Sequence, residues 1–235
     1  MRDHPGGSPA ARRPSRWLGP GKAAVAIGAS TGGPQALLQL LGAIPADLPA
    51  YLFVVQHIHP RFTPMLARRL GEGSALSVRE ACDGELPRVG TVYLAPGGFH
   101  LRLERSPAGP VLRLSGAPPR HGVRPCLDVL FASLAEVFRQ RAVAVVLTGM
   151  GRDGLEGCRA VRARRGVVLA EAEETCTVFG MSRAPIEAGL VDRVVPLGEM
   201  AAAIVEAMPG LAGPTGVLRR RIACRPGAGH GSMAG

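Results

Sequence analysis

Residues 23–41 read AAVAIGASTGGPQALLQLL and contain the most informative pattern of the chain. The apolar run Ala23–Ile27 predicts a buried strand, and Pro34–Leu41 has the character of a helix. Between them lies Ser30, flanked by small residues, and the glycines allow a bend sharp enough to lift the serine hydroxyl clear of a sheet. The order of strand, glycine turn and helix therefore predicts a Gly-x-Ser-x-Gly nucleophile elbow.

Strand-like and helix-like runs alternate along most of the chain. Buried strands separated by helices of this length predict an α/β fold, in which a doubly wound, mostly parallel sheet has helices on both faces. The expected strands are 23–27, 51–56, 77–80, 142–148 and 167–170, and the expected helices are 34–41, 63–71, 127–139, 154–165 and about 198–208.

Three short runs interrupt this alternation. Residues 91–95, 99–104 and 111–115 are joined by Pro-Gly-Gly and by Ser-Pro-Ala-Gly-Pro, which are turn-forming sequences. We therefore expect a short antiparallel insertion, or hairpin, in this part of the chain.

The length and composition predict one large domain. The chain has 235 residues, of which 46% are hydrophobic, and both of its ends are rich in Pro, Gly and Arg. We expect a catalytic domain over residues 22–212, between disordered basic tails at 1–21 and 213–235. No apolar run reaches the roughly 20 residues of a membrane-spanning helix, and the first residues lack an apolar signal segment. A cytoplasmic protein without membrane insertion is therefore expected.

The charge and the cysteines exclude further classes of function. The net charge is +10, but arginines in the two tails supply most of it, and the chain holds only one Trp, two Tyr and six Phe. Without aromatic residues interleaved with basic ones, a nucleic-acid partner is not expected. The five cysteines form no Cys-x-x-Cys pair, which indicates reduced thiols rather than a zinc site. Neither a cofactor nor a metal is expected.

Three reactive side chains follow predicted parallel strands. Ser30 follows the first strand, His57 follows 51–56, and Asp153 follows 142–148 through a glycine turn that contains Met150. Groups at the carboxyl ends of neighbouring parallel strands meet at one edge of a sheet. Together they predict a serine nucleophile, a histidine base and an orienting carboxylate. Backbone N–H groups after Ser30 and around Met150 are expected to stabilise an oxyanion.

Each of these residues also has a purely structural explanation. Ser30 or Thr31 could cap the helix that begins near Pro34, and Asp153 could cap the helix that follows it. His57 could be a packed histidine, and His59 competes with it as the base. His57 is favoured because it directly follows the strand.

Six ordered motifs resemble the catalytic domain of the CheB-type chemotaxis receptor methylesterases, over about residues 23–205. They are residues 27–33, 56–58, 93–97, 124–131, 147–154 and 178–181. The resemblance implies a cytoplasmic serine hydrolase that removes methyl esters from glutamates of methylated chemoreceptor helices, or of a similar protein substrate. In some members of this family receptor glutamines are also deamidated. It further implies a triad of Ser30, His57 and Asp153, with Thr31 and Met150 lining the substrate and oxyanion site.

The sequence departs from this family in two places. Family members usually carry an N-terminal receiver domain, and the 22 residues before the first strand are too few for one. Control by an attached receiver domain is therefore not expected. In the stretch Met181–Pro185 the proline is displaced from its usual place, which predicts an altered loop beside the site.

Three other functions remain open from the sequence. A glycine turn before a helix could bind a nucleotide, although this one lacks the Gly-x-Gly-x-x-Gly order. A metal hydrolase could use His57 and His59 with the distant His100 and His121, although their spacing matches no known ligand set. A protein that keeps the fold without catalysis is the third alternative, and the complete set of Ser30, His57 and Asp153 argues against it.

Overall fold

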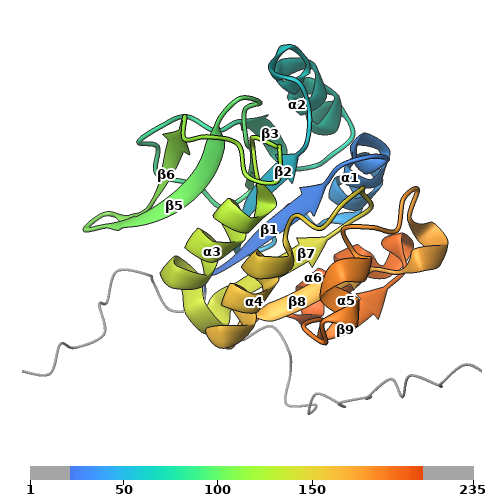
Figure 1. Cartoon of the computed structure of the whole chain (residues 1–235). Coiled ribbons are helices and arrows are strands. Elements are labelled where there is room, and N and C mark those ends of the chain that lie inside the picture. Colours follow the sequence, from blue (N-terminus) through green and yellow to red (C-terminus); the bar gives the residue numbers. More distant parts are fainter. Residues whose placement is uncertain (1–21, 209–235) are drawn as a thin grey trace, which may run out of the picture.

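A seven-stranded parallel sheet forms the middle layer of the molecule (Figure 1). The computed structural model describes residues 22–208. The strand order is β3-β4-β2-β1-β7-β8-β9, so the chain winds outward from β1 in one direction and then returns to fill the other side. The strands of this sheet are β1 (Ala23–Ala29), β2 (Ala50–Gln56), β3 (Ser77–Glu80), β4 (Thr91–Leu94), β7 (Ala142–Val146), β8 (Val167–Glu171) and β9 (Arg193–Val195).

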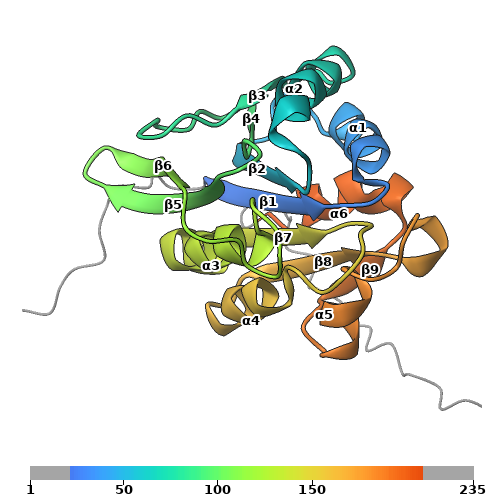
Figure 2. The same ribbon diagram turned by 45° about the horizontal axis from the view of Figure 1, so that its top comes forward.

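Helices cover both faces of the sheet, as Figure 2 shows. On one face lie α1 (Gly33–Ala43), α2 (Thr63–Glu72) and α6 (Met200–Glu206), and on the other lie α3 (Leu127–Phe138), α4 (Leu155–Ala163) and α5 (Arg183–Glu187). The described residues also contain four short 3-10 turns, Pro60–Phe62, Arg139–Arg141, Glu173–Thr175 and Leu197–Glu199. This three-layer arrangement confirms the predicted α/β class.

Strand β1 belongs to the core on both faces. It pairs with β2 on one side and β7 on the other, and all seven of its residues are buried. Val25 and Ile27 pack into the cluster under α1, whereas Ala24 and Ala26 pack into the cluster under α3. Because successive side chains of a strand point to opposite faces, a strand buried on both sides is apolar throughout, which explains the run at 23–27.

The predicted insertion is correct for two of its three runs. Strands β5 (His100–Ser106) and β6 (Gly109–Ser115) form an antiparallel hairpin, which lies beside α3 in Figure 1. The run at 91–95 was wrongly included. Its strand, β4, pairs in parallel with both β2 and β3, and Val92, Tyr93 and Leu94 are completely buried. Burial on both faces places this run in the main sheet despite its shortness.

The remaining differences concern boundaries and short elements. The predicted helix 154–165 is α4 over Leu155–Ala163, and the last helix begins at Met200. Strand β9 and helix α5 were not predicted, since three and five residues are too few to establish a periodicity. No helix among residues 22–208 has the length and hydropathy needed to cross a bilayer. The expected tails at 1–21 and 213–235 lie outside the described residues.

Candidate active site

The predicted serine turn lies at the carboxyl end of β1. The backbone N–H of Ser30 donates to the carbonyl oxygen of Thr148 over 3.0 Å, and the Ser30 carbonyl accepts from Gly33 N–H over 2.8 Å. Gly32 is the N-cap of α1 with φ 80°, in the left-handed region that favours glycine. No side chain caps α1, so Ser30 and Thr31 do not serve as its N-cap. The serine hydroxyl is therefore not used for capping.

His57 and Asp153 form a close pair beside this turn. His57 Nε2 lies 2.7 Å from Asp153 Oδ2, although 96 positions separate the two residues in the sequence. The side chains are 12% and 3% exposed, so the pair is largely shielded from water. The backbone N–H of His57 also donates to the carbonyl of Ala29 over 3.1 Å, which places His57 beside the residue preceding Ser30. His59, the competing base, instead accepts from the N–H of Arg61.

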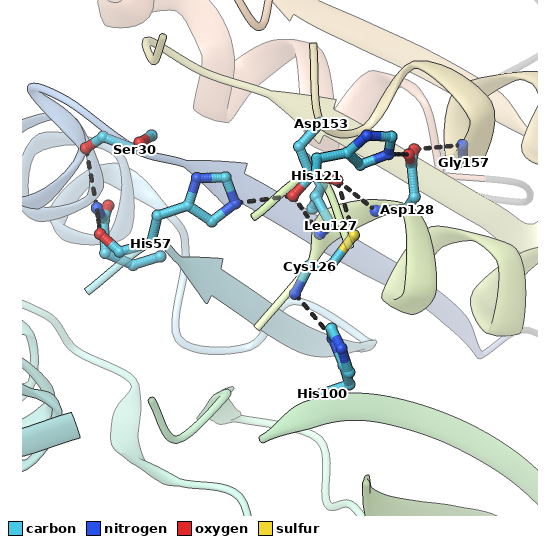
Figure 3. A network of polar contacts seen from close by, with 10 residues as sticks. Ser30, His57, His100, His121, Cys126, Leu127, Asp128, Asp153 and Gly157 are labelled. Atoms are coloured by element: carbon cyan, nitrogen blue, oxygen red, sulfur yellow. Dashed lines mark hydrogen bonds and ion pairs between the residues drawn. The ribbon is translucent and has the colours of Figure 1, made fainter. Parts of the chain in front are cut away.

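Asp153 is held by the start of a helix that is distant in sequence. Its carboxylate accepts from Leu127 N–H over 2.7 Å, from Asp128 N–H over 3.0 Å, and from Cys126 Sγ over 3.0 Å (Figure 3). Leu127 and Asp128 open α3, whose own N-cap residue, Cys126, makes no capping bond with its side chain. Asp153 therefore caps α3 from outside, and the positive end of the α3 dipole faces the carboxylate. The sequence suggested that Asp153 could cap the helix after it, but the N-cap residue of that helix, α4, is Gly154, and no side chain caps it.

The pKa values follow from this environment. Burial alone would raise the pKa of Asp153, but the hydrogen bonds from His57, Cys126, Leu127 and Asp128 outweigh burial and lower that pKa below its usual value. Burial, and then the charge of Asp153, raise the pKa of Cys126 to about 12. The carboxylate is therefore ionised at neutral pH, while the thiol keeps its proton and donates a hydrogen bond to Asp153. A protonated, buried thiol of this kind is a poor nucleophile.

In Figure 3 the His57 ring is drawn between Ser30 and Asp153. Since an ionised carboxylate only accepts hydrogen bonds, His57 Nε2 carries the proton of the pair, and Nδ1 is the ring nitrogen left to accept another. Within residues 22–208 no hydrogen bond joins the Ser30 hydroxyl to the His57 ring. Catalytic hydrogen bonds commonly form only with substrate bound, so a structure without substrate that lacks this bond is compatible with a serine nucleophile and a histidine base.

The two remaining predicted residues lie on the loops around Ser30. The Thr148 hydroxyl donates to the Thr31 carbonyl over 2.9 Å and accepts from Val178 N–H over 2.9 Å, which ties the serine turn to the ends of two other segments. Met150 is 71% exposed on the glycine turn after β7. Within the described chain the backbone N–H groups of Thr31 and Met150 donate to no protein acceptor. Both donors are available to a bound group.

The loop at 178–181 is hydrogen-bonded to the glycine turn that follows β7. Gly149 N–H donates to the Val178 carbonyl over 3.0 Å, and Met181 N–H donates to the Gly149 carbonyl over 2.8 Å. The displaced proline, Pro185, lies within the first turn of α5. Proline is tolerated there because it needs no intrahelical N–H partner.

One group of side chains among residues 22–208 has the chemistry and spacing of a metal site. It consists of His121, Cys126, Asp128 and Asp153, whose ligand atoms lie within 4.8 Å of one another. Their carboxylate oxygens, however, already accept hydrogen bonds from His57, His121, Cys126 and the helix N–H groups. The group is a hydrogen-bonded support for Asp153.

The four histidines of the metal-hydrolase alternative do not form a cluster among the described residues. His100 instead accepts from Cys126 N–H and lies close to the Pro118 carbonyl.

Several residues of this support were not predicted from the sequence. Cys126 and Asp128 lie within the motif 124–131 and Thr148 lies within the motif 147–154, but no sequence pattern gave these residues a role of their own. The buried Glu171 accepts from Thr148 N–H over 2.8 Å and belongs to none of the six motifs. A carboxylate at the end of an apolar strand, as in 167–171, is the one local signal that pointed to Glu171.

A parallel sheet that carries a glycine-flanked serine and a histidine–carboxylate pair on one edge defines an α/β protein with a hydrolase-like site. Comparison with known proteins gives the family. The family model described as CheB methylesterase matches residues 25–204. This chain belongs to the CheB methylesterase family.

Three similar proteins illustrate the match. The protein-glutamate methylesterase/protein-glutamine glutaminase of Geobacillus kaustophilus is 47% identical over 87% of this chain and 58% of its own length. The protein of the same name from Clostridium acetobutylicum is 44% identical over 80% of this chain and 54% of its own length. The chain thus spans about half the length of these relatives. The crystal structure of the Thermotoga maritima CheB methylesterase catalytic domain is 42% identical, with a TM-score of 0.77 over 79% of this chain and 98% of that one.

Proposed function

We propose that this protein is a serine hydrolase that removes methyl esters from glutamate side chains of a protein substrate. The observation that carries the proposal is the largely shielded His57–Asp153 pair, with 2.7 Å between Nε2 and Oδ2, beside a serine that caps no helix. The names of the relatives support the reaction, and the family supports methylated chemoreceptor helices as the substrate.

The proposed chemistry starts at Ser30. Its hydroxyl oxygen attacks the ester carbonyl while the proton passes to His57 Nδ1, and Asp153 stabilises the imidazolium through Nε2. The tetrahedral oxyanion accepts hydrogen bonds from the unpaired N–H groups of Thr31 and Met150. Methanol leaves with the proton from His57. Water then attacks the acyl-enzyme, with His57 again as base, and releases the glutamate carboxylate.

The same steps convert a glutamine side chain to glutamate, with ammonia as the leaving group. The relatives named protein-glutamine glutaminase favour this second activity. A nucleotide-binding function has no comparable support, since the glycine turn belongs to a CheB methylesterase match that extends over residues 25–204.

The test is methanol release from a methylated receptor fragment. We expect Ser30→Ala, His57→Ala and Asp153→Asn each to lower kcat by about 1,000-fold or more, because the three groups act as one unit. Ser74→Ala is the matched control, since the Ser74 hydroxyl donates to the Leu41 carbonyl on a different part of the chain. Turnover by Ser30→Ala close to that of the wild type would refute the proposal.

A further inference from the structure

Gln56 is a buried residue at the end of β2, directly before His57, and it pairs with Ala29, the residue before Ser30. Its side chain is only 2% exposed. Nε2 donates to the carbonyl oxygen of Ser30 over 2.8 Å and to the carbonyl oxygen of His57 over 3.0 Å. Both amide hydrogens are therefore used on the backbones of two residues of the proposed triad.

The bond to Ser30 joins the end of β2 to the serine turn, one step beyond the last backbone bond between the two strands, from His57 N–H to the Ala29 carbonyl. Ala29 and Gln56 are the last paired residues of β1 and β2, and Ser30 and His57 lie one position beyond them. Past the end of a sheet the ladder hydrogen bonds no longer hold neighbouring chains at a set distance. The Gln56 amide replaces them at the position where the nucleophile and the base leave the sheet.

The Gln56 amide fits at this position only because the neighbouring residue of α1 is a glycine. A Cβ at Gly33 would lie 2.0 Å from Gln56 Oε1, so the first residue of α1 has to lack a side chain for the amide to fit. Oε1 itself is buried and has no hydrogen-bond partner among the described residues. An unpaired buried oxygen opposes folding. An apolar side chain of the same length would avoid that cost, which indicates that the amide is kept for its two donors.

We propose that Gln56 is a positioning residue, which sets the distance between the Ser30 hydroxyl and the His57 ring through the backbones of both residues. This inference rests on the proposed function. Gln56 touches neither the substrate nor the reacting atoms, so its loss lowers the rate of acyl-enzyme formation and leaves substrate affinity nearly unchanged.

The decisive variant is Gln56→Met, which keeps the length of the side chain and removes both donors. We expect kcat for methanol release to fall about 10- to 100-fold, in line with the cost of small misplacements of reacting groups, while KM changes less than about twofold. The rate at which a fluorophosphonate labels Ser30 should fall by a similar factor, because labelling needs the serine and its base but no receptor substrate.

A second variant, Gln56→Glu, adds a pH readout. A protonated carboxyl donates one hydrogen bond, whereas an ionised one donates none and faces two carbonyl oxygens. The labelling rate of Gln56→Glu relative to the wild type should therefore fall as the pH rises from 6 to 9, and the same ratio for Gln56→Met should stay constant. A purely structural role for residue 56 does not produce this difference.

Ser133→Ala is the matched control, because Ser133 is also buried and its hydroxyl also bonds to backbone groups, Leu103 N–H and the Leu130 carbonyl, away from the triad. It should lower the melting temperature without changing either rate.

Rates for folded Gln56→Met within twofold of the wild type would overturn the inference, as would failure of both Gln56 variants to fold. If the wild type releases no methanol, the proposed function fails, and labelling of Ser30 still decides the role of Gln56. A wild type that is not labelled would overturn the inference as well.

Discussion

Asp153 shows how the role of one residue depends on its surroundings. In the sequence it is an aspartate before a helix, where capping is the common explanation. In the structure its four hydrogen-bond donors come from His57 and from the start of α3. The charged carboxylate is thereby stabilised despite burial, and it in turn determines which nitrogen of His57 carries the proton.

The lowered pKa of Asp153 predicts a pH-dependent contribution to stability. An acid whose pKa is depressed by folding stabilises the protein fully above its unfolded pKa, which is about 3.9, and this contribution is lost as the pH falls through the folded-state pKa. Asp153→Asn should therefore lower the free energy of unfolding by about 1–3 kcal/mol at pH 7, with the difference shrinking below about pH 4. Urea unfolding at pH 7, 5 and 3 measures it, and an equal difference at all three pH values would contradict this account.

At the scale of elements, the close approach of α3 to β1 brings the Asp153 support to the sheet edge. Leu127, the first residue of α3, is completely buried against Gly28 and donates its N–H to Asp153. A Cβ at Gly28 would lie only 2.0 Å from Leu127 Cδ2. The absence of a side chain at Gly28 is therefore what lets the start of α3 reach the carboxylate.

Gly28→Ala tests this contact. The added methyl group has to displace Leu127, so we expect a loss of about 1–3 kcal/mol in the free energy of unfolding, as in other overpacked cores, together with a lower kcat. Gly116→Ala is the control, since a Cβ there would meet nothing within 4 Å. Thermal unfolding and methanol release measure the two effects, and a Gly28→Ala protein with unchanged stability and kcat would show that α3 does not depend on this approach.

At the scale of the whole molecule, one sheet separates two apolar clusters. Ile27 lies in the cluster under α1, α2 and α6, whereas Tyr51 and Tyr93 lie in the cluster under α3 and α4. The strands between them contribute side chains to both clusters. We therefore expect the two layers to fold as one cooperative unit.

Ile27→Ala tests this cooperativity from one face with probes on the other. Ile27 is completely buried, so the substitution should lower the free energy of unfolding by about 2–5 kcal/mol. The chain has only two tyrosines, and both report on the opposite face. Tyrosine absorbance and far-UV circular dichroism should shift together to the same lower midpoint. A tyrosine transition that keeps the wild-type midpoint would show that the two layers unfold separately.

Local patterns were sufficient for five of the seven strands of the main sheet, β1, β2, β3, β7 and β8, and for the position of the three side chains that follow β1, β2 and β7. The apolar runs at 23–27, 51–56 and 142–148 are long enough to reveal buried strands, and a parallel sheet brings their carboxyl ends to one edge by its geometry alone. The same reasoning misplaced β4, because a four-residue strand carries no periodicity of its own and only its pairing with β2 and β3 defines it.

The residues that surround these three side chains are known only from the tertiary structure. Cys126 and the start of α3 contact Asp153 from 25 to 27 positions away, and Gln56 reaches the Ser30 carbonyl across 26 positions. Such contacts depend on how helices lie against the sheet, which is set by the volumes of many side chains at once rather than by any short run of residues. The types of reactive group could thus be read from the order of the amino acids, whereas the protonation, orientation and support of each group required the tertiary structure.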